Sequence, residues 1–266
     1  MSHDKNPIIA YDPWHALNQL TSARIGLGRA GMSLPTRANL DFQLAHALAR
    51  DAVHIPLDFS KLAQALEQLG YHYQRLQSQA ENQRHYLQRP DLGRCLNEHS
   101  YQALATSDIH PVDAVIVVAD GLSSTAIENH ALGFLQLLVP VLTKAGYQLA
   151  PIALVKHGRV AIGDAIADHY KARLCITLIG ERPGLSSPDS MGIYFTYQAK
   201  AGVSTDADRN CISNIHANGL TYEQALKKLC YLIAGAEQLK LSGVELKDET
   251  TDTGLELSGS ANFLLN

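Results

Sequence analysis

The sequence lacks the features that would place it in several broad classes of protein. It has no basic excess, since its 266 residues carry a formal net charge of -4, and we therefore expect no nucleic-acid partner. It has no run of about 18 consecutive apolar residues, so no membrane-spanning helix is expected. The beginning of the chain lacks the apolar stretch of a signal peptide. These absences favour a globular, cytoplasmic protein with no membrane partner.

Cysteine is scarce, and the familiar metal and nucleophile motifs are absent. The four cysteines are too scattered for a C-x-x-C metal pair or a disulfide framework. Free cysteines are typical of proteins in a reducing compartment. The twelve histidines show no zinc-ligand spacing such as H-E-x-x-H. No G-x-x-x-x-G-K-[ST] phosphate loop occurs, and "DGLSS" (120–124) is not the G-x-S-x-G elbow of a nucleophilic serine. We expect no metal site in this chain.

One dinucleotide-type motif is present. The stretch "RIGLGRAG" (24–31) places Gly26, Gly28 and Gly31 in the order G-x-G-x-x-G. A working fingerprint follows a strand and opens a helix. Here residues 14–25 have a helical pattern, and the next helix is expected to start near Pro35, several residues after the last glycine. We interpret the glycines as a linker between helices that needs unusual backbone angles; a phosphate loop is the alternative.

The chain changes character near residue 108. Residues 1–107 are predicted to be a helical region, because apolar residues recur at helical spacing in 35–53 and 58–77 and no alternating strand pattern is evident. Beyond the boundary at "SDIHPVD" (107–113), apolar strands alternate with amphipathic helices. The strands are expected within 114–119, 150–160, 173–184 and 191–199, and the helices within 125–146, 161–172 and 221–243, with Gly146 and Gly243 as C-terminal caps.

This alternation predicts an α/β fold. Apolar strands separated by helices indicate a mostly parallel sheet that is covered on both faces, and so a three-layer domain over 108–266. In such sheets, ligands bind beside the carboxyl ends of the strands. We therefore expect three polar loops to share one edge: 120–121, 158–160 and 180–184. Simple chain turns with charges in solvent are the alternative for each loop.

A fourth polar segment, "DADRNCISNIHANG" (206–219), offers Arg209, Cys211, Asn214 and His216. Cys211 and His216 are a candidate thiolate–imidazole pair, although their spacing alone does not establish one. A structural cysteine is the alternative. Because no nucleophile, metal or phosphate motif accompanies these loops, we interpret the edge as a cradle for a cofactor that carries its own chemistry.

Several motifs together resemble one known family, the ethanolamine ammonia-lyase small (light) subunit. They run in order through most of the chain: "GRAG", "PTRANLDFQLAHALARDAV", "YLQRPDLGR", "DGLSSTAI", "HGRVAIGDAI", "GERPGLSSPDSMGIY" and "DRNCISNIH". "GERPGL" and "DR-x-CISNIH" are the most specific of them. The resemblance implies a subunit of an adenosylcobalamin-dependent lyase that converts ethanolamine to acetaldehyde and ammonia by radical chemistry.

The resemblance also implies how the work is divided between subunits. The large subunit would hold the ethanolamine and all catalytic residues, so none is expected here. The helical region and a Rossmann-like domain (108–266) of this chain would pack on it and enclose the cobalamin. The family's cobalamin contacts carry over as Val160 of "GRV", Glu181 of "GERPGL" and Cys211 of "CISNIH". On chemistry alone, second candidates for amide or phosphate contacts are Arg159, Arg182 and Asn214.

Two further expectations concern the cofactor and the location. The D-x-H-x-x-G motif, in which a protein histidine replaces the lower axial ligand of cobalamin, fails at Asp108-Ile109-His110 because Asp113 stands where glycine should be. We therefore expect the cofactor to keep its own dimethylbenzimidazole (base-on). Family members often carry a longer N-terminal extension, which in some helps packaging into a bacterial microcompartment. Because the folded pattern here begins by about Asp12, the resemblance implies the cytoplasm first, with a microcompartment as the alternative. The rival functions are a stand-alone α/β enzyme using a Cys–His pair or a nucleotide, and a non-catalytic scaffolding subunit.

Overall fold

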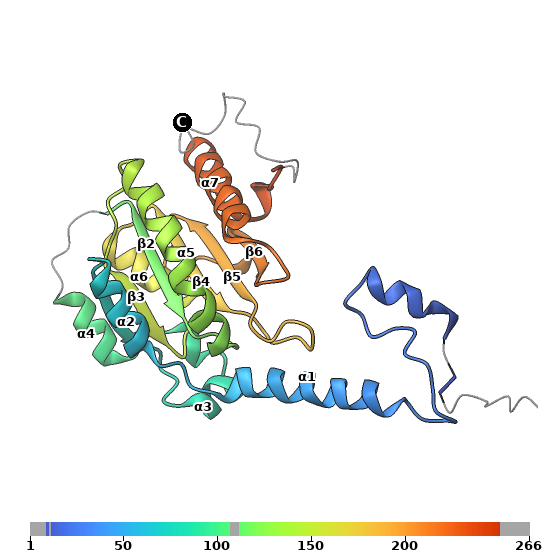
Figure 1. Ribbon diagram of the computed structural model, residues 1–266. Helices are drawn as coiled ribbons and strands as arrows, with labels where there is room; N and C mark the ends of the chain where they lie inside the picture. The colour runs from blue at the N-terminus through green and yellow to red at the C-terminus, as the bar shows by residue number, and fades with distance from the viewer. Residues whose placement is uncertain (1–8, 11, 107–111, 251–266) are drawn as a thin grey trace, which may run out of the picture.

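The computed structural model describes residues 9–10, 12–106 and 112–250. Within these residues, six strands form one sheet in the order β1-β3-β2-β4-β5-β6 (Figure 1). They are β1 (Tyr73–Gln77), β2 (Ala114–Ala119), β3 (Ile152–Lys156), β4 (Leu174–Gly180), β5 (Met191–Tyr197) and β6 (Arg209–Ile215). The first four strands in this order pair in parallel, whereas β5 is antiparallel to both β4 and β6. The fold is therefore α/β with a mixed, mostly parallel sheet.

Helices supply an apolar core on each side of the sheet. α2 (Phe59–Gln68), α5 (Ser124–Lys144) and α7 (Tyr222–Leu239) contribute to one core, and α4 (Glu98–Ala105) and α6 (Ile162–Tyr170) to the other. All six residues of β2 are buried between them, which explains why this strand is an unbroken apolar run. The other described helices are α1 (Thr36–His54), α3 (Gln83–Gln88) and the 3₁₀ turns η1 (Pro13–Gln19), η2 (Leu92–Arg94), η3 (Asp206–Asp208) and η4 (Gly243–Glu245).

α5 is the central helix of the larger core. The Ser123 hydroxyl accepts from the Ala126 N–H over 3.2 Å and caps the helix N-terminus. Gly146, with a φ of +86°, follows the C-terminus as predicted. By length and composition α5 is apolar enough to cross a membrane, but Phe134, Leu135 and Leu138 are fully buried in the core. Burial against the sheet accounts for its apolar composition.

Three local predictions are wrong. Residues 73–77 form β1 and not the end of a helix over 58–77, because α2 ends at Gln68 and the chain turns through Gly70. Residues 209–215 form β6 rather than a polar loop. α7 ends before Lys240, whose left-handed backbone (φ +61°) takes the place predicted for Gly243. Both missed strands lie at the ends of the sheet, where few side chains are buried and the apolar alternation is weak.

The glycine-rich stretch at 24–31 is a linker, as interpreted. Gly26, Gly28 and Gly31 all have positive φ angles, of +57°, +74° and +62°. No strand of the sheet precedes them in the described part of the chain, and the 3₁₀ turn η1 occupies only part of the helix expected over 14–25. Pro35 stands at the N-cap of α1, four residues after the last glycine. A phosphate loop would need a strand directly before these glycines.

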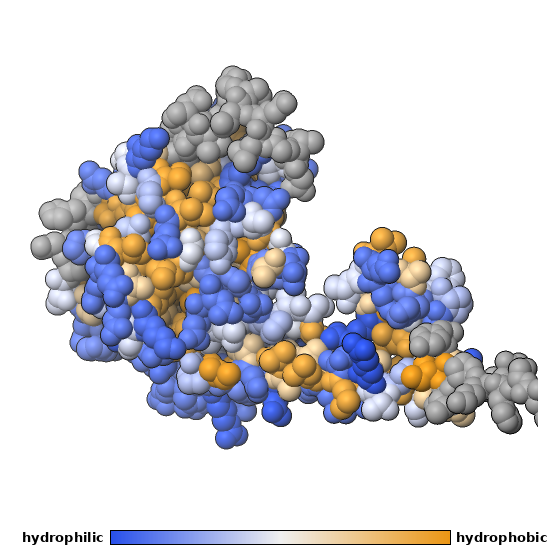
Figure 2. Space-filling model, in the orientation of Figure 1, coloured by the Kyte–Doolittle hydropathy of each residue, from blue (hydrophilic) through white to orange (hydrophobic). Residues whose placement is uncertain are grey.

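The N-terminal arm (η1, the linker and α1) projects away from the sheet (Figure 1). Of α1, all of which is described, Ala52 alone is buried. Leu40, Leu44 and Leu48 form a stripe that is 56%, 61% and 49% exposed, and Figure 2 shows apolar residues gathered along this helix. The predicted boundary between 107 and 108 falls outside the described residues, and the division into two regions stays a prediction.

Candidate functional site

The loops that follow β2, β3 and β4 meet at the carboxyl edge of the sheet, where strand order placed them. The Leu122 N–H donates to the Gly180 carbonyl over 2.9 Å and joins the first loop to the third. The buried Asp120 carboxylate joins the first loop to the second, because it accepts from the N–H groups of His157 (2.8 Å) and Gly158 (3.1 Å). Asp120 therefore anchors the edge through backbone hydrogen bonds.

An arginine stacked on a tyrosine forms one wall of this edge. The Arg159 guanidinium lies 4.4 Å from the centroid of the Tyr86 ring. The Tyr86 hydroxyl donates to the Gly158 carbonyl over 3.0 Å, and burial raises its pKa, which keeps the hydroxyl protonated. Arg159 Nε is buried with no hydrogen-bond partner among the described residues. The wall thus presents a donor whose position is set but whose hydrogen bond is not made.

Two pockets with a common wall open at this edge. Arg159, Val160 and Tyr194 line both. The first pocket, of about 390 Å³, also contains Cys211, and the second, of about 440 Å³, also contains Glu181. The remaining walls are Pro90, Arg94, Ala161, Asp206 and Arg209 in the first pocket, and Tyr86, Gly121, Leu122, Ile179, Gly180 and Arg182 in the second. The structure thus brings Val160, Glu181 and Cys211 together.

Glu181 is held by two hydrogen bonds to one of its oxygens. Oε2 accepts from the Ser190 hydroxyl over 2.6 Å and from the Asn214 N–H over 3.1 Å. No described residue donates to Oε1. A Cβ on residue 192 would lie 2.8 Å from Oε1, so Gly192 leaves the carboxylate its room. The geometry leaves one carboxylate oxygen available as an acceptor.

Cys211 lies on β6 directly opposite Tyr194 of β5. Its side chain is accessible, but the surrounding protein atoms partly desolvate the thiol and raise its pKa. Among the described residues, His216 hydrogen bonds to Asn214 Oδ1 (2.8 Å) and not to Cys211. The structure therefore does not bring Cys211 and His216 together as a nucleophile and its base.

Two residues before Cys211 on β6, Arg209 forms a buried ion pair that ties β6 to α6. Arg209 donates from both terminal nitrogens to Asp164, over 2.6 and 2.7 Å, and one nitrogen also reaches the Thr196 hydroxyl. The two charged side chains are only 3% and 4% exposed. Burial raises the pKa of Asp164, and the adjacent guanidinium opposes that rise. This fork-to-fork pair holds Arg209, which lines the first pocket, in place.

Sequence reasoning missed several residues that line the two pockets. Tyr86, Arg94 and Tyr194 were not candidates, although Tyr194 stands in a predicted strand and Arg94 within the family motif "YLQRPDLGR". The Asn214 side chain contacts His216, and it is the Asn214 backbone that contacts Glu181. Asp108 and His110, the failed axial-ligand motif, lie outside the described residues.

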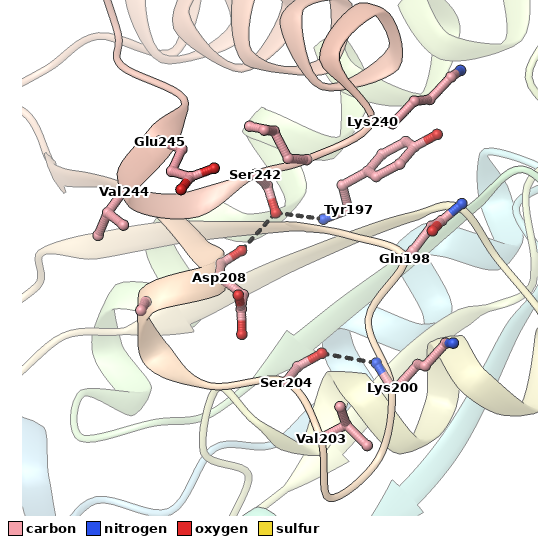
Figure 3. Close-up of a pocket in the computed structure, with 12 residues that line it drawn as sticks. Tyr197, Gln198, Lys200, Val203, Ser204, Asp208, Lys240, Ser242, Val244 and Glu245 are labelled. Carbon is pink, nitrogen blue, oxygen red and sulfur yellow. Dashed lines mark hydrogen bonds between the residues drawn. The ribbon is translucent and has the colours of Figure 1, made fainter.

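A separate pocket lies between the end of β5 and the 3₁₀ turns η3 and η4 (Figure 3). Its volume is about 460 Å³, and it shares no lining residue with the two pockets above. In it the Tyr197 N–H donates to the Ser242 hydroxyl, and the Lys200 N–H donates to that of Ser204.

No group of three or more histidine, cysteine or acidic side chains in the described ranges is arranged to hold a metal ion.

The comparisons with known proteins agree with the motifs. The ethanolamine ammonia-lyase light chain (EutC) family matches residues 11–247. The ethanolamine ammonia-lyase small subunit of Pseudomonas fluorescens (strain Pf0-1) is 50% identical over 99% of this chain and 98% of its own length. The small subunit of Pseudomonas putida (strain GB-1) is 52% identical over 96% of each chain.

These matches cover the arm, the sheet and all the loops of the candidate site. The sequence identity of about 50% over nearly the whole chain shows common ancestry. The chain therefore belongs to the ethanolamine ammonia-lyase light chain family and is a subunit of that carbon–nitrogen lyase.

Proposed function

We propose that this chain, with its large subunit, encloses adenosylcobalamin in an enzyme that converts ethanolamine to acetaldehyde and ammonia. A small subunit implies a large-subunit partner. The single observation that supports the cofactor role is the convergence of Val160, Glu181 and Cys211 on two pockets with a common wall. Val160 and Glu181 come from the loops that follow β3 and β4, and Cys211 comes from β6, so three separate segments of the chain contribute.

The side chains at the edge fit the chemistry of a corrinoid. Such a cofactor presents a broad apolar ring with amide side chains that both donate and accept hydrogen bonds. Glu181 Oε1 would accept from an amide N–H, the unpaired Arg159 Nε would donate to an amide or phosphate oxygen, and Val160 would contact apolar surface. Cys211 would pack as a small soft group. When bound, the cofactor supplies the radical chemistry; this chain positions it and excludes water from one side.

The domain over 108–266 is a Rossmann-like three-layer domain, supported by parallel strands with helices on both faces. The cofactor stays base-on, because the D-x-H-x-x-G motif fails in the sequence. An electron paramagnetic resonance spectrum of cob(II)alamin on ¹⁵N-labelled protein tests this: the axial nitrogen splitting should remain that of unlabelled dimethylbenzimidazole, and splitting from a labelled histidine would contradict it.

The large subunit is also the proposed partner of the N-terminal arm. An isolated helix of 19 residues with an uncovered apolar stripe is marginal in water. The arm reaches the loop that carries Glu181, since Arg24 donates to the carbonyl of Leu185 over 3.4 Å. A subunit that closes the pockets would therefore meet the arm as well. The large subunit binds ethanolamine and carries the catalytic residues.

The location we propose is the cytoplasm, and a bacterial microcompartment is the alternative. The four free thiols support the cytoplasm.

The test of the function is acetaldehyde release from ethanolamine with added adenosylcobalamin. Three reactions are compared: this chain alone, the large subunit alone and the mixture. We expect turnover only in the mixture. Turnover by this chain alone would establish a stand-alone enzyme, and no turnover with a large subunit that is active with another small subunit would contradict the proposal.

A scaffolding role is distinguished by cofactor affinity. In the assembled enzyme, Glu181→Ala and Cys211→Ala should weaken adenosylcobalamin binding. The loss for the glutamate should be about 10- to 100-fold in Kd, since a lost hydrogen bond to a charged group is worth about 1.5–3 kcal/mol. Unchanged affinity in both variants, with normal subunit assembly, would favour a chain that docks without touching the cofactor.

A further inference from the structure

A second polar cluster contacts the loop that carries Glu181 and lies outside the two pockets. His130 of α5 is 7% exposed, and both of its ring nitrogens have partners. Nδ1 lies 2.8 Å from the hydroxyl of Tyr222 on α7, and Nε2 lies 3.2 Å from Oδ2 of Asp189. Asn129 Nδ2 donates to the same aspartate oxygen over 3.1 Å. None of these side chains lines the pockets described above.

The hydrogen-bond network assigns one consistent arrangement of protons. Asp189 can only accept when ionised, so His130 Nε2 carries the proton and donates to it. Nδ1 then accepts from the Tyr222 hydroxyl. Burial, with the nearby charges of Asp189 and Glu223, raises the pKa of Tyr222 and keeps that hydroxyl a donor. A chain of two hydrogen bonds therefore runs from α7 through α5 to the loop.

The anchored residue is next to the residue that orients Glu181. Ser190 follows Asp189 directly, and its hydroxyl donates to Glu181 Oε2 over 2.6 Å. The residue on the other side, Pro188, is held through its carbonyl by the Ser123 hydroxyl over 2.8 Å. The Glu181 N–H donates to the Ser190 carbonyl, which closes the loop at its base. The Asp189 side chain is therefore the group through which α5 holds the loop, by hydrogen bonds from Asn129 and His130.

We propose that His130 is a positioning residue, which holds the 181–190 loop against α5 through Asp189 and thereby fixes the Glu181 carboxylate at the pocket. The benefit of this placement to cofactor binding rests on the proposed function. The placement itself does not, and it can be measured without any cofactor. The Asn214 N–H donates to Glu181 Oε2, so its protection from hydrogen exchange reports directly on where the carboxylate lies.

The experiment measures amide hydrogen exchange by NMR in the full chain. Glu181→Ala sets the reference, because it removes the acceptor of the Asn214 N–H. Asp189→Ala removes the anchor from the partly exposed loop side, and His130→Gln removes it from the helix side. We expect Asn214 to exchange about 3- to 10-fold faster in all three variants, the range for losing one hydrogen bond. In the Glu181→Ala background, Asp189→Ala should accelerate Asn214 exchange by less than about 2-fold further. The reason is that both changes act on the same hydrogen bond, from the Asn214 N–H to the Glu181 carboxylate.

Two controls separate positioning from loss of stability. Asp189→Asn keeps an oxygen that accepts from His130 and should restore most of the Asn214 protection. Asp168→Ala removes an exposed aspartate of α6 and should leave it unchanged. Wild-type exchange at Asn214 in both Asp189→Ala and His130→Gln would overturn the inference. Equal acceleration throughout the sheet, or no effect of Glu181→Ala itself, would also overturn it.

Cofactor affinity then separates this inference from the proposed function. In the assembled enzyme, Asp189→Ala should weaken adenosylcobalamin binding less than Glu181→Ala does, and the two effects should not add. If Glu181→Ala leaves the affinity unchanged while Asn214 exchange responds as expected, the assignment of Glu181 to the cofactor fails and the role of His130 stands.

Discussion

Glu181 occupies its place because residue 192 has no side chain. A Cβ there would stand 2.8 Å from Oε1 and 3.1 Å from Cγ of the glutamate. Gly192 lies on β5, two residues after Ser190, so the loop and the strand together define the room available to the carboxylate. The position of the Glu181 carboxylate therefore depends on the absence of a Cβ atom at residue 192.

At this position we predict that Gly192→Ala displaces the Glu181 carboxylate with little loss of stability, because the end of a flexible side chain can move aside. The adenosylcobalamin Kd of the assembled enzyme should rise by about 10- to 100-fold, the value of one charged hydrogen bond. Gly184→Ala is the matched control, since its Cβ would meet nothing nearer than 3.8 Å. Equal affinities of the two variants would contradict the prediction.

Asp120 is the second residue on which the edge depends. Its carboxylate accepts from three backbone N–H groups, those of Gly121, His157 and Gly158. We predict that Asp120→Ala lowers the free energy of unfolding by about 3 kcal/mol, because buried donors lose their acceptor. Asp120→Asn retains one accepting oxygen, so its free energy of unfolding should lie between those of wild type and Asp120→Ala. Urea denaturation measures both, and an Asp120→Ala variant as stable as wild type would refute the anchoring role.

At the scale of elements, the Arg209–Asp164 pair joins β6 to α6. Removing one partner of a buried pair leaves the other charge without compensation, so Arg209→Ala should destabilise the chain by about 3–5 kcal/mol near pH 7. Arg209→Lys should recover only part of this, since lysine cannot form the two parallel bonds seen here.

The loss should depend on pH with a defined sign. Burial already raises the pKa of Asp164 above its ordinary value of 3.8, and Arg209→Ala removes the guanidinium that opposes the rise. A carboxyl whose folded pKa is raised contributes stability below its unfolded pKa and loses it as pH rises through the folded pKa. The destabilisation should therefore be smaller at about pH 4 than at about pH 7. Unfolding curves at both values test this, and adding Asp164→Asn should abolish the difference.

At the scale of the whole molecule, the N-terminal arm has too little contact with the sheet to be stabilised by it. Leu40→Gln with Leu44→Gln should change the free energy of unfolding of the isolated chain by less than about 0.5 kcal/mol, as for other exposed positions. Binding to the large subunit should weaken by about 10-fold or more, because burying each leucine is worth about 1.5–3 kcal/mol. Leu239→Gln, an exposed leucine at the end of α7, is the control. Unchanged binding by the double variant would place the large subunit elsewhere.

Most of the α/β order could be predicted from sequence, and the reason is burial. β2 and β4 are buried throughout and mostly apolar because both faces are covered, and α5 carries a cap at each end. β1 has one buried residue, Leu76, and β6 alternates weakly, so neither gives a clear strand pattern. Parallel strand order also predicted that the loops carrying Val160 and Glu181 would share an edge.

By itself, the sequence determined the family, the linker character of the glycines and the loops that form the site. Those properties depend on local patterns and on ordered motifs that are legible along the chain. Only the tertiary structure decided that Arg159 stacks on Tyr86, that Glu181 needs Gly192 and that His130 holds Asp189. Each of these contacts joins residues that are distant in sequence, or depends on how closely two segments approach, and no spacing along a chain encodes that distance.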